Sequence, residues 1–471
     1  MQAKIFFGSN EASKENLSER KSPYSGEVVS TAPICDEADA KKALTIAHNA
    51  THNARASTLA QRCDWLLDVA RKLKEQKEDI AKTITDEVGK PITFARVEVE
   101  RCIETITLSA ETMRTMHGET INTDAMNSGK KTLSFFRREP VGVVVAITPF
   151  NFPLNLVAHK LGPALVAGNT VVLKPTPEAP LTSYKFAKLF IESEYAIKDA
   201  LSVVYGDAEV GSALISSDIP RVISFTGSVP VGNIITKNSG IKKIGLELGG
   251  NAATFVEKSA DLALAAQRCA LGAFVNSGQV CISLQRIYVQ SEVYDEFASL
   301  MAEETKKLKV GSPYEDETFM GPLIDDEAAS RAMGWIESAI EEGAKPLLPP
   351  HREGRMFHPC VMAEVTDDMA IVCEEVFAPI VSLVKVDSFD DALPRMNNSP
   401  YGLQFSVFTN DLRITNRAID ELHAGGIIIN DMPTLRFDIQ PYGGVKLSGV
   451  GREGPRFAIE EMTEIKSIVI C

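Results

Sequence analysis

The sequence predicts an α/β fold with parallel sheets, and three observations support this prediction. From residue 141 onward, short apolar segments alternate with helical segments, which is typical of parallel strands buried beneath helices. The same alternation resumes after Gly249-Gly250 and predicts a second α/β domain. The 471 residues, of which 44% are hydrophobic, are enough for roughly two to three domains of ordinary size.

Residues 36–117 carry a nearly unbroken helical pattern. Asp36 is a suitable N-cap, because apolar residues recur after it at spacings of three and four. A second helical run, which contains Trp65 and Leu73, should end near Gly89-Lys90-Pro91. Residues 132–138 are β-prone and partly alternating, and they predict a strand or an extended arm.

The predicted strands of the first sheet are apolar and follow one another at short intervals. They are residues 141–147, 170–173, 201–204 and 221–225, with helices over 154–167 and near 181–194 between them. After the glycine pair, a helix near 261–275 precedes a strand over 287–289. The C-terminal segment 465–470 predicts a last short strand, of a kind that often completes a sheet on a partner subunit.

The composition argues against nucleic acid and membranes as partners. Lys and Arg number 49 against 63 Asp and Glu, so the formal net charge is −14, whereas binding to polyanions needs a surplus of basic residues. The N-terminus lacks the apolar core of a signal peptide, and no apolar run has the length of a membrane span. The eight cysteines form no CxxC pair, and His48 and His52 have no third metal ligand nearby. We therefore expect reduced thiols, a cytoplasmic location and no metal site.

Two residues are candidates for covalent and acid–base chemistry. Cys281 follows a predicted helix and Gly278, where backbone N–H groups would favour the thiolate; a buried structural cysteine is the alternative. Glu247 lies between two leucines and precedes two glycines. Apolar surroundings would raise its pKa toward that of a general base, and an ion pair at a strand end is the alternative.

Asn151 and Lys174 follow the first two predicted strands of the alternating region, and ligands bind at the carboxyl ends of such strands. The Asn151 amide can donate to a developing oxyanion, or it can stabilise a turn between two prolines. Lys174 can reach ribose hydroxyls or phosphate, or it can simply end its strand. The one GxGxxG match, residues 449–454, follows no apolar strand, and we interpret it as a surface turn.

Taken in order, six segments resemble the aldehyde dehydrogenase superfamily, and the resemblance covers essentially the whole chain. It implies a Rossmann-type NAD(P)-binding domain without GxGxxG (residues 1–118 and 140–248) and a catalytic α/β domain (249–456). It also implies a small β oligomerisation arm (119–139 and 457–471) and a homodimer or homotetramer. The six segments are Thr148-Pro-Phe-Asn-Phe-Pro153, Leu173-Lys-Pro175, Phe225-Thr-Gly-Ser228, Leu246-Glu-Leu-Gly-Gly250, Gly278-Gln-Val-Cys281 and Glu374-Glu-Val-Phe-Ala-Pro379.

The resemblance also implies a hydrolytic mechanism. Cys281 would attack the aldehyde carbonyl as a thiolate, and Asn151 with the Cys281 backbone N–H would stabilise the thiohemiacetal oxyanion. Hydride transfer to nicotinamide would leave a thioester, and Glu247 would activate the water that hydrolyses it.

For the cofactor, the resemblance implies NAD or NADP, with NADP at least tolerated. Ala378 replaces the commoner glycine of its motif, a small change. Pro177 stands where many NAD-preferring relatives carry a glutamate, and Glu178 comes one residue later, so repulsion of a 2′-phosphate is removed. The implied contacts are Lys174 at the adenine ribose, Gly227 and Ser228 near the pyrophosphate, Glu375 at the nicotinamide ribose and Phe377 near the nicotinamide, with Thr148, Pro149, Phe150, Thr176, Pro177, Glu178, Phe225 and Leu248 around them.

Arg101 and Arg436 resemble positions at the substrate mouth of relatives that oxidise short anionic aldehydes, and His159 can line the same entrance. Val280 stands where several phosphate-handling relatives carry arginine, which argues against a phosphorylated substrate and leaves small 2-hydroxy or carboxylated aldehydes open. We therefore expect a short aldehyde that is anionic or 2-hydroxylated, similar to lactaldehyde, a semialdehyde or glyceraldehyde 3-phosphate. Surface salt bridges are the alternative for both arginines. A coenzyme-A-dependent acylating enzyme and a non-enzymatic crystallin-like protein are the competing functions, and Glu247 argues against the first of these.

Overall fold

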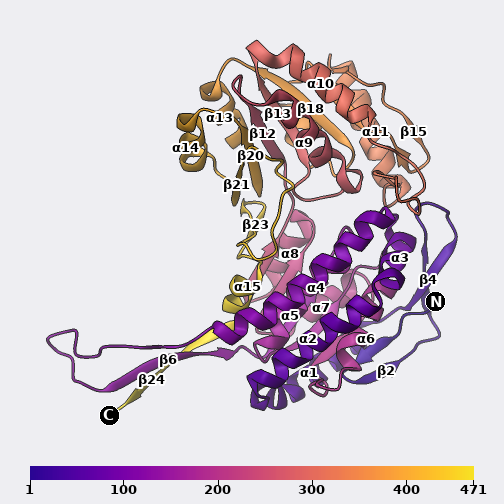
Figure 1. The fold of residues 1–471 in the computed structure, drawn as a ribbon. Coiled ribbons are helices and arrows are strands. Elements are labelled where there is room, and N and C mark those ends of the chain that lie inside the picture. The colour runs from indigo at the N-terminus through magenta and orange to yellow at the C-terminus, as the bar shows by residue number, and fades with distance from the viewer.

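The chain forms two large β-sheets packed with helices in a computed structural model that describes residues 1–471 (Figure 1). The first sheet has eight strands in the order β2-β1-β9-β8-β7-β10-β11-β23. The α/β prediction is confirmed, and each predicted strand of this sheet begins and ends within two residues of an observed one. Its parallel strands are β9 (Leu201–Val203), β8 (Thr170–Lys174), β7 (Val143–Ile147), β10 (Val222–Thr226) and β11 (Lys243–Glu247), and its antiparallel strands are β1 (Ile5–Phe7), β2 (Asn10–Ala12) and β23 (Gly449–Val450).

The strand order of the first sheet reverses between β7 and β10. The chain passes from β7 to β8 and β9 on one side, and then crosses back to β10 and β11 on the other side. The loops that follow β7 and β10 therefore flank a topological switch point at the carboxyl edge of the sheet. Open α/β sheets bind their ligands at such a point.

Eight helices pack around the first sheet. The first of them begins with a capping box between Asp36 and Asp39, so Asp36 is the N-cap as predicted. The third ends at Gly89, which adopts a left-handed conformation with φ +69°. The helices are α1 (Glu37–Ala56), α2 (Leu59–Glu75), α3 (Lys77–Val88), α4 (Ile92–Thr115), α5 (Asn155–Val166), α6 (Pro180–Ile191), α7 (Ala208–Ser216) and α8 (Val229–Asn238).

The second sheet has seven strands in the order β14-β17-β18-β13-β12-β20-β21, and only β14 is antiparallel. It forms the upper lobe in Figure 1. Its strands are β12 (Ala252–Val256), β13 (Leu284–Gln290), β14 (Lys345–Pro346), β17 (Cys360–Ala363), β18 (Ile380–Val386), β20 (Gln404–Phe408) and β21 (Gly426–Ile429), and its helices are α9 (Leu262–Phe274), α10 (Tyr294–Lys306), α11 (Asp326–Glu341), α12 (Ala370–Cys373), α13 (Phe389–Asn397) and α14 (Leu412–Glu421).

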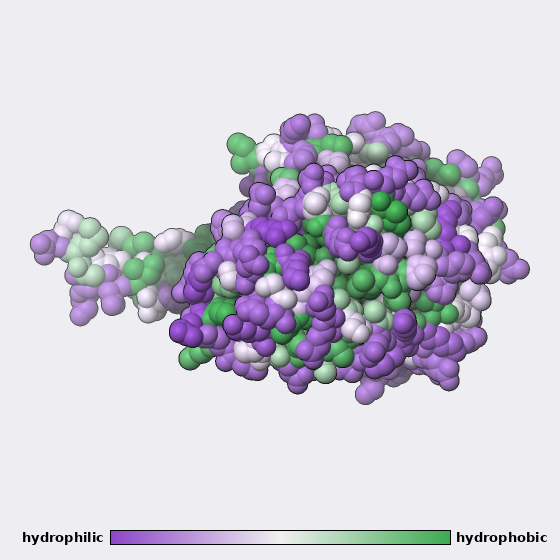
Figure 2. Space-filling view, turned by 90° about the horizontal axis from the view of Figure 1, so that it is seen from above, coloured by the Kyte–Doolittle hydropathy of each residue, from purple (hydrophilic) through white to green (hydrophobic).

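A three-stranded arm projects from the first lobe (Figure 1). It joins β5 (Glu119–Thr120), β6 (Leu133–Pro140) and the C-terminal β24 (Thr463–Ile470) in an antiparallel sheet. The expected arm segment 457–471 starts instead inside a helix, α15 (Pro455–Glu461), which packs against α4 and α5. Figure 2 shows hydrophobic side chains along the projecting arm. The remaining strands form two-stranded sheets: β3 (Leu17–Lys21) with β4 (Val28–Pro33), β15 (Arg352–Glu353) with β16 (Met356–Phe357), and β19 (Tyr401–Gly402) with β22 (Val445–Lys446).

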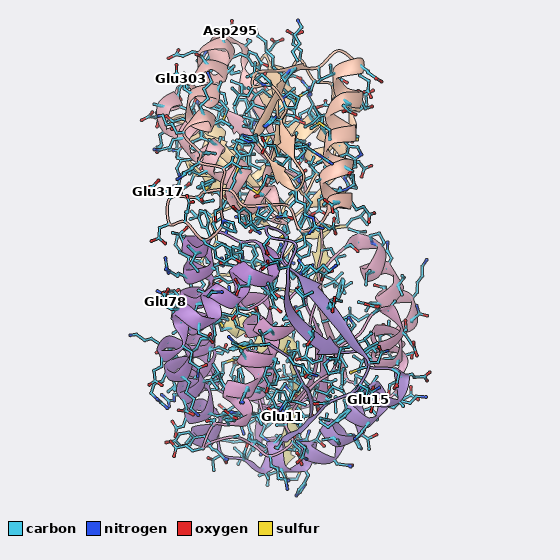
Figure 3. All side chains as sticks on the ribbon, turned by 90° about the vertical axis from the view of Figure 1, so that its right-hand side faces the viewer. Glu11, Glu15, Glu78, Asp295, Glu303 and Glu317 are labelled. Atoms are coloured by element: carbon cyan, nitrogen blue, oxygen red, sulfur yellow. The ribbon has the colours of Figure 1, made fainter.

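Acidic side chains point outward from both lobes on the face drawn in Figure 3, where exposed examples are labelled. This distribution accords with the net charge of −14. None of the helices combines the length and the hydropathy needed to cross a bilayer. The labelled acids are Glu11, Glu15, Glu78, Asp295, Glu303 and Glu317.

Candidate active site

Cys281 lies in the loop between α9 and β13, in the wall of a cavity of about 230 Å³. The loop reaches this place through three successive residues with positive φ, Asn276 (52°), Ser277 (57°) and Gly278 (73°). A Cβ at Gly278 would overlap the carbonyl oxygen of Ala378, so only glycine lets the two backbones approach this closely. This packing fixes where the thiol lies in the cavity wall.

The Cys281 thiol lies 3.0 Å from the Tyr442 hydroxyl. Burial raises the pKa of the thiol to about 11, although the tyrosine hydrogen bond and the charge of Arg436 lower it. The thiol has a side chain as its hydrogen-bond partner, and the expectation that backbone N–H groups favour the thiolate stays a prediction. At neutral pH the thiol is protonated, and its attack on a carbonyl requires a proton acceptor.

Glu247 ends β11 and is buried. Its Oε2 has no hydrogen-bond partner, and a Cβ at Gly443 would lie 2.8 Å from its Oε1. Burial and the neighbouring Glu453 carboxylate raise the pKa of Glu247 well above its usual range. Tyr442 precedes Gly443, so one dipeptide lies beside both the Cys281 thiol and the Glu247 carboxyl.

A second cavity, of about 20 Å³, is lined by Glu247, Glu453 and Lys160, and it has room for about one water molecule. Lys160 Nζ lies 3.2 Å from Glu453 Oε1. Although burial opposes them, the charges of Lys160, His159 and Arg436 lower the pKa of Glu453 to about 2. Glu453 is therefore ionised beside Glu247 and strengthens the proton affinity of the latter.

Asn151 follows β7 and is tied to the cysteine loop. Its Nδ2 donates to the carbonyl oxygen of Gln279 at 3.2 Å, and Asn276 Nδ2 donates to the same oxygen at 3.3 Å. Gln279 lies two residues before Cys281, so this hydrogen bond couples the two loops. Asn151 itself does not line the 230 Å³ cavity, whereas the next residue, Phe152, does.

Arg101 and Arg436 both line the Cys281 cavity, and one carboxylate holds them together. Arg101 donates to the two oxygens of Asp438 at 2.9 and 2.7 Å. Arg436 Nε lies 3.4 Å from the same carboxylate, and Arg436 Nη2 donates to Glu453 at 3.1 Å. The structure therefore brings together the two arginines that the sequence analysis singled out.

His159 does not line the Cys281 cavity, in contrast to the expectation that it borders the entrance. It belongs to α5, which is buried along its whole length, so the ring faces the interior. Its Nε2 lies 3.0 Å from both Asp438 Oδ1 and Arg436 Nη2. Burial and the charge of Arg436 lower the pKa of the imidazole.

The expected cofactor residues of the first lobe lie at the ends of its parallel strands or in the loops that follow them. Lys174, which ends β8, is buried, and burial lowers its pKa; no ion pair or hydrogen bond engages its ammonium group. Two residues later the Thr176 hydroxyl donates to the Glu178 carboxylate, while Pro177 is exposed. Thr148, Pro149 and Phe150 follow β7, and Phe225 lies in β10.

Close packing shapes the loop after β10 and the start of α8, which follows that loop. A Cβ at Gly227 would lie 2.5 Å from the Phe225 ring, and one at Gly232 would lie 2.8 Å from Leu248. Ser228 is the N-cap residue of α8, and its side chain makes no capping hydrogen bond. The first N–H groups of α8 therefore lack a side-chain acceptor at the switch point.

Glu375 faces the glycine pair from the second lobe. Its Oε1 accepts a hydrogen bond from the Gly250 N–H at 2.9 Å, and a Cβ at Gly249 would overlap its other oxygen. Burial raises the pKa of Glu375 to about 7. Phe377 has a φ of +50°, and its ring lies edge-on to that of Phe150 with centroids 6.1 Å apart.

The family model described as "Aldehyde dehydrogenase family" matches residues 10–468. The chain belongs to the aldehyde dehydrogenase family. It is 42% identical over 448 residues to the 3-sulfolactaldehyde dehydrogenase of Priestia aryabhattai, covering 95% of this chain and 93% of that protein. It is 40% identical over 458 residues to the lactaldehyde dehydrogenase of Methanococcus aeolicus, covering 96% and 97%.

Among solved structures, the NADP-dependent glyceraldehyde-3-phosphate dehydrogenase of Bacillus halodurans, in complex with NADP, superposes with a TM-score of 0.97 at 33% identity. The match covers 100% of this chain and 99% of that one. The protein is thus an NAD(P)-dependent oxidoreductase that oxidises an aldehyde to the acid. The acylating and non-enzymatic alternatives are not favoured.

Three residues of the candidate site were missed by sequence reasoning. Tyr442 contacts the thiol, and the centre of the Tyr442 ring lies 3.7 Å from the Arg436 guanidinium. Asp438 bridges the arginines, and Glu453 adjoins Glu247. Of the three, only Glu453 lies in a motif that the sequence analysis singled out, the GxGxxG match. That segment is not a free surface turn, because its first two residues form β23 beside the end of β11.

Proposed function

We propose that this aldehyde dehydrogenase oxidises short aldehydes that carry an anionic or hydroxyl group, and that Cys281 is its nucleophile. The observation that carries the proposal is that Cys281, Arg101 and Arg436 line one cavity of about 230 Å³. A cavity of that size suits a small substrate, and the guanidinium groups suit a carboxylate, sulfonate or phosphate. The names of the two sequence relatives, which act on lactaldehyde and 3-sulfolactaldehyde, support the same substrate class.

The proposed chemistry begins at the thiol. Cys281 Sγ bonds to the carbonyl carbon as its proton passes to solvent water, and the carbonyl oxygen becomes the oxyanion of a thiohemiacetal. Asn151 and the Cys281 N–H stabilise that oxyanion. The bound dinucleotide supplies the hydride acceptor for this adduct. Glu247 then takes a proton from water as the water adds to the thioester carbon, and the Cys281 thiolate leaves, which releases the acid.

The residues at the switch point fit a dinucleotide. A buried lysine with no ion pair, Lys174, suits ribose hydroxyls or a phosphate oxygen. The start of α8, at Gly227 and Ser228, presents N–H groups to a pyrophosphate. Glu375 and Phe377 would hold the nicotinamide end from the second lobe. Residues 1–118 and 140–248 are accordingly proposed as the cofactor domain and 249–456 as the catalytic domain, except that β23 joins the cofactor sheet.

We predict that both NAD and NADP support turnover. Pro177 offers no carboxylate to a 2′-phosphate, and the Glu178 carboxylate is engaged by the Thr176 hydroxyl. The check is kcat/KM with each dinucleotide for the wild type and for Glu178→Gln. A strong NAD preference that survives in Glu178→Gln would show that another residue faces the ribose.

We predict that Arg436→Leu lowers kcat/KM about 10- to 150-fold for anionic aldehydes, since a charge-assisted hydrogen bond contributes roughly 1.5–3 kcal/mol. Neutral aldehydes of the same size should lose far less. Arg101→Leu should have a smaller effect, because the Arg101 side chain is 27% exposed against 9% for Arg436. Equal losses for neutral and anionic substrates would make Arg436 a structural residue, because its pairing with Glu453 is lost in both cases.

We further propose that the arm joins copies of the chain into a homodimer or homotetramer. β24 is an edge strand, and its Ile465, Val469 and Ile470 side chains are exposed. An edge with apolar side chains is a surface that proteins normally cover. Sedimentation of the full chain and of a Val469→Asp variant would reveal whether the arm holds the oligomer together.

We also propose a reducing, cytoplasmic setting. All eight cysteines are free thiols, and disulfide-free chains with this many cysteines are typical of reducing compartments.

A further inference from the structure

Two helices of the first lobe, α5 and α6, are capped by carboxylates from other helices. The N-cap residue of α5, Leu154, makes no side-chain capping hydrogen bond. Instead, Glu98 of α4 accepts hydrogen bonds from the N–H groups of Leu154 and Asn155 at 2.9 and 3.1 Å. This is the helix that follows the Asn151 loop directly, so Glu98 holds the far end of that loop.

The second oxygen of Glu98 forms an ion pair with Lys90, and both side chains are only 1% exposed. The Lys90 ammonium also lies 3.8 Å from the centre of the Phe152 ring. The pair therefore holds Phe152 through its lysine and the start of α5 through its glutamate. Both residues line the Cys281 cavity.

We propose that the Lys90–Glu98 ion pair positions the Asn151 amide against the cysteine loop. The proposal rests on the proposed role of Asn151 in stabilising the oxyanion. Asn151 lies one residue before Phe152, and its Nδ2 is 3.2 Å from the Gln279 carbonyl in the loop of Cys281. A shift of Phe152 or of the start of α5 therefore moves the amide relative to the thiol.

Stability alone does not account for this pair. Burying two charges costs free energy of desolvation, and apolar residues of similar volume often stabilise a protein as well or better. The Lys90–Glu98 pair also lies in the wall of the reactive cavity rather than in the centre of a lobe. The pair fixes the orientation of the Asn151 loop, because Lys90 contacts Phe152 and Glu98 binds the start of α5.

The test is a double-mutant cycle in kcat between Glu98→Gln and Asn151→Ala, measured with saturating cofactor. Glu98→Gln keeps the side-chain shape and one acceptor oxygen but loses the charge that binds Lys90. We expect it to lower kcat about 10- to 100-fold, as a displaced group costs in other sites, with a smaller change in the aldehyde KM. In the Asn151→Ala background the same substitution should cost less than about 3-fold.

Glu87→Gln is the matched control. Glu87 is also fully buried, and it too caps a helix, because its two oxygens accept from the N–H groups of Leu181 and Thr182 at the start of α6 at 2.8 Å each. α6 follows the Lys174 loop and not the Asn151 loop. The fold-decreases in kcat caused by Glu87→Gln and by Asn151→Ala should therefore multiply in the double variant. Lys90→Met is measured in the same cycle as a second variant, in case Glu98→Gln is poorly folded, and it should show the same loss of additivity.

If Glu98→Gln and Asn151→Ala lower kcat independently, so that their effects multiply in the double variant, the positioning proposal is overturned. The role of Asn151 is then left intact. An unchanged kcat in Asn151→Ala alone would overturn the oxyanion assignment, and the positioning proposal with it. Thermal unfolding of each variant separates both outcomes from a general loss of stability. A variant that is less stable but has a correctly positioned site keeps the wild-type kcat when it is assayed well below its unfolding temperature.

Discussion

Cys281→Ser is expected to lower kcat roughly 10⁵- to 10⁶-fold, the loss that removal of a covalent nucleophile causes in other enzymes. Serine differs from cysteine by one atom and keeps the hydrogen bond to Tyr442 within reach. Its hydroxyl is a much weaker nucleophile, because it is far less acidic than a thiol and loses its proton less readily. The formation of reduced dinucleotide, followed by its absorbance, measures the loss.

Cofactor binding and thermal unfolding serve as internal checks on Cys281→Ser, and both should be close to those of the wild type. Cys35→Ser is the matched control, because burial raises the pKa of the Cys35 thiol to the same value of about 11. Cys35 lies in the first lobe, where it accepts from the Tyr205 N–H at 3.4 Å, and it does not line the cavity. Substantial turnover by Cys281→Ser, or an equal loss in Cys35→Ser, would remove Cys281 from the mechanism.

The first sheet could be predicted well because its strands are buried on both faces. Every residue of β8 is buried, so the strand reads as an unbroken apolar run that ends at a lysine. The second sheet was harder to predict. The prediction over 287–289 covers less than half of β13, which starts at Leu284 and includes Arg286. Arg286 is buried because its guanidinium donates to the carbonyl oxygens of Asn251, Arg395 and Met396, and these partners come from distant segments.

The candidate reactive residues were proposed from resemblance to a family, and the side chains that contact them were not predicted. Tyr442, Asp438 and Glu453 all come from the C-terminal 40 residues of the chain, and tertiary structure alone brings them to Cys281 and Glu247. Glycines make this approach possible. A Cβ at Gly449 would overlap the Leu246 carbonyl oxygen, so the segment can lie alongside β11 only with glycine there. Nothing in the local sequence says which strand such a glycine will face.

The two arginines illustrate the same limit. Their residue type indicated an anion site, and the structure brings both to one cavity. Spacing in the sequence did not show that Asp438 binds both of them. This carboxylate holds the guanidinium groups in place and also reduces their net charge. Under the proposed function, an anionic substrate would meet two oriented donors whose positive charge is partly compensated, which favours directional hydrogen bonding over simple charge attraction.

Glu247→Gln is expected to slow turnover about 10²- to 10⁴-fold by impairing hydrolysis of the thioester, the range that general-base catalysis contributes. The amide has nearly the same shape but cannot accept a proton from water. Formation of the thioester should persist, so rapid mixing should show a burst of reduced dinucleotide equivalent to the number of sites, followed by slow steady turnover. Denatured, acid-quenched protein should carry the acyl group on Cys281, as mass spectrometry can show.

The pH dependence separates a base at Glu247 from a structural role. Burial raises the pKa of Glu247 well above its usual range, so in the wild type the ionised, active form accumulates as the pH rises and hydrolysis should accelerate with it. Glu247→Gln has no carboxyl to titrate, and that acceleration should disappear. Glu461→Gln is the control, because Glu461 lines the same small cavity and burial raises its pKa too, yet it should keep the wild-type profile. A burst in the wild type as large as in Glu247→Gln, or an unchanged pH profile in the variant, would assign the water activation to another group.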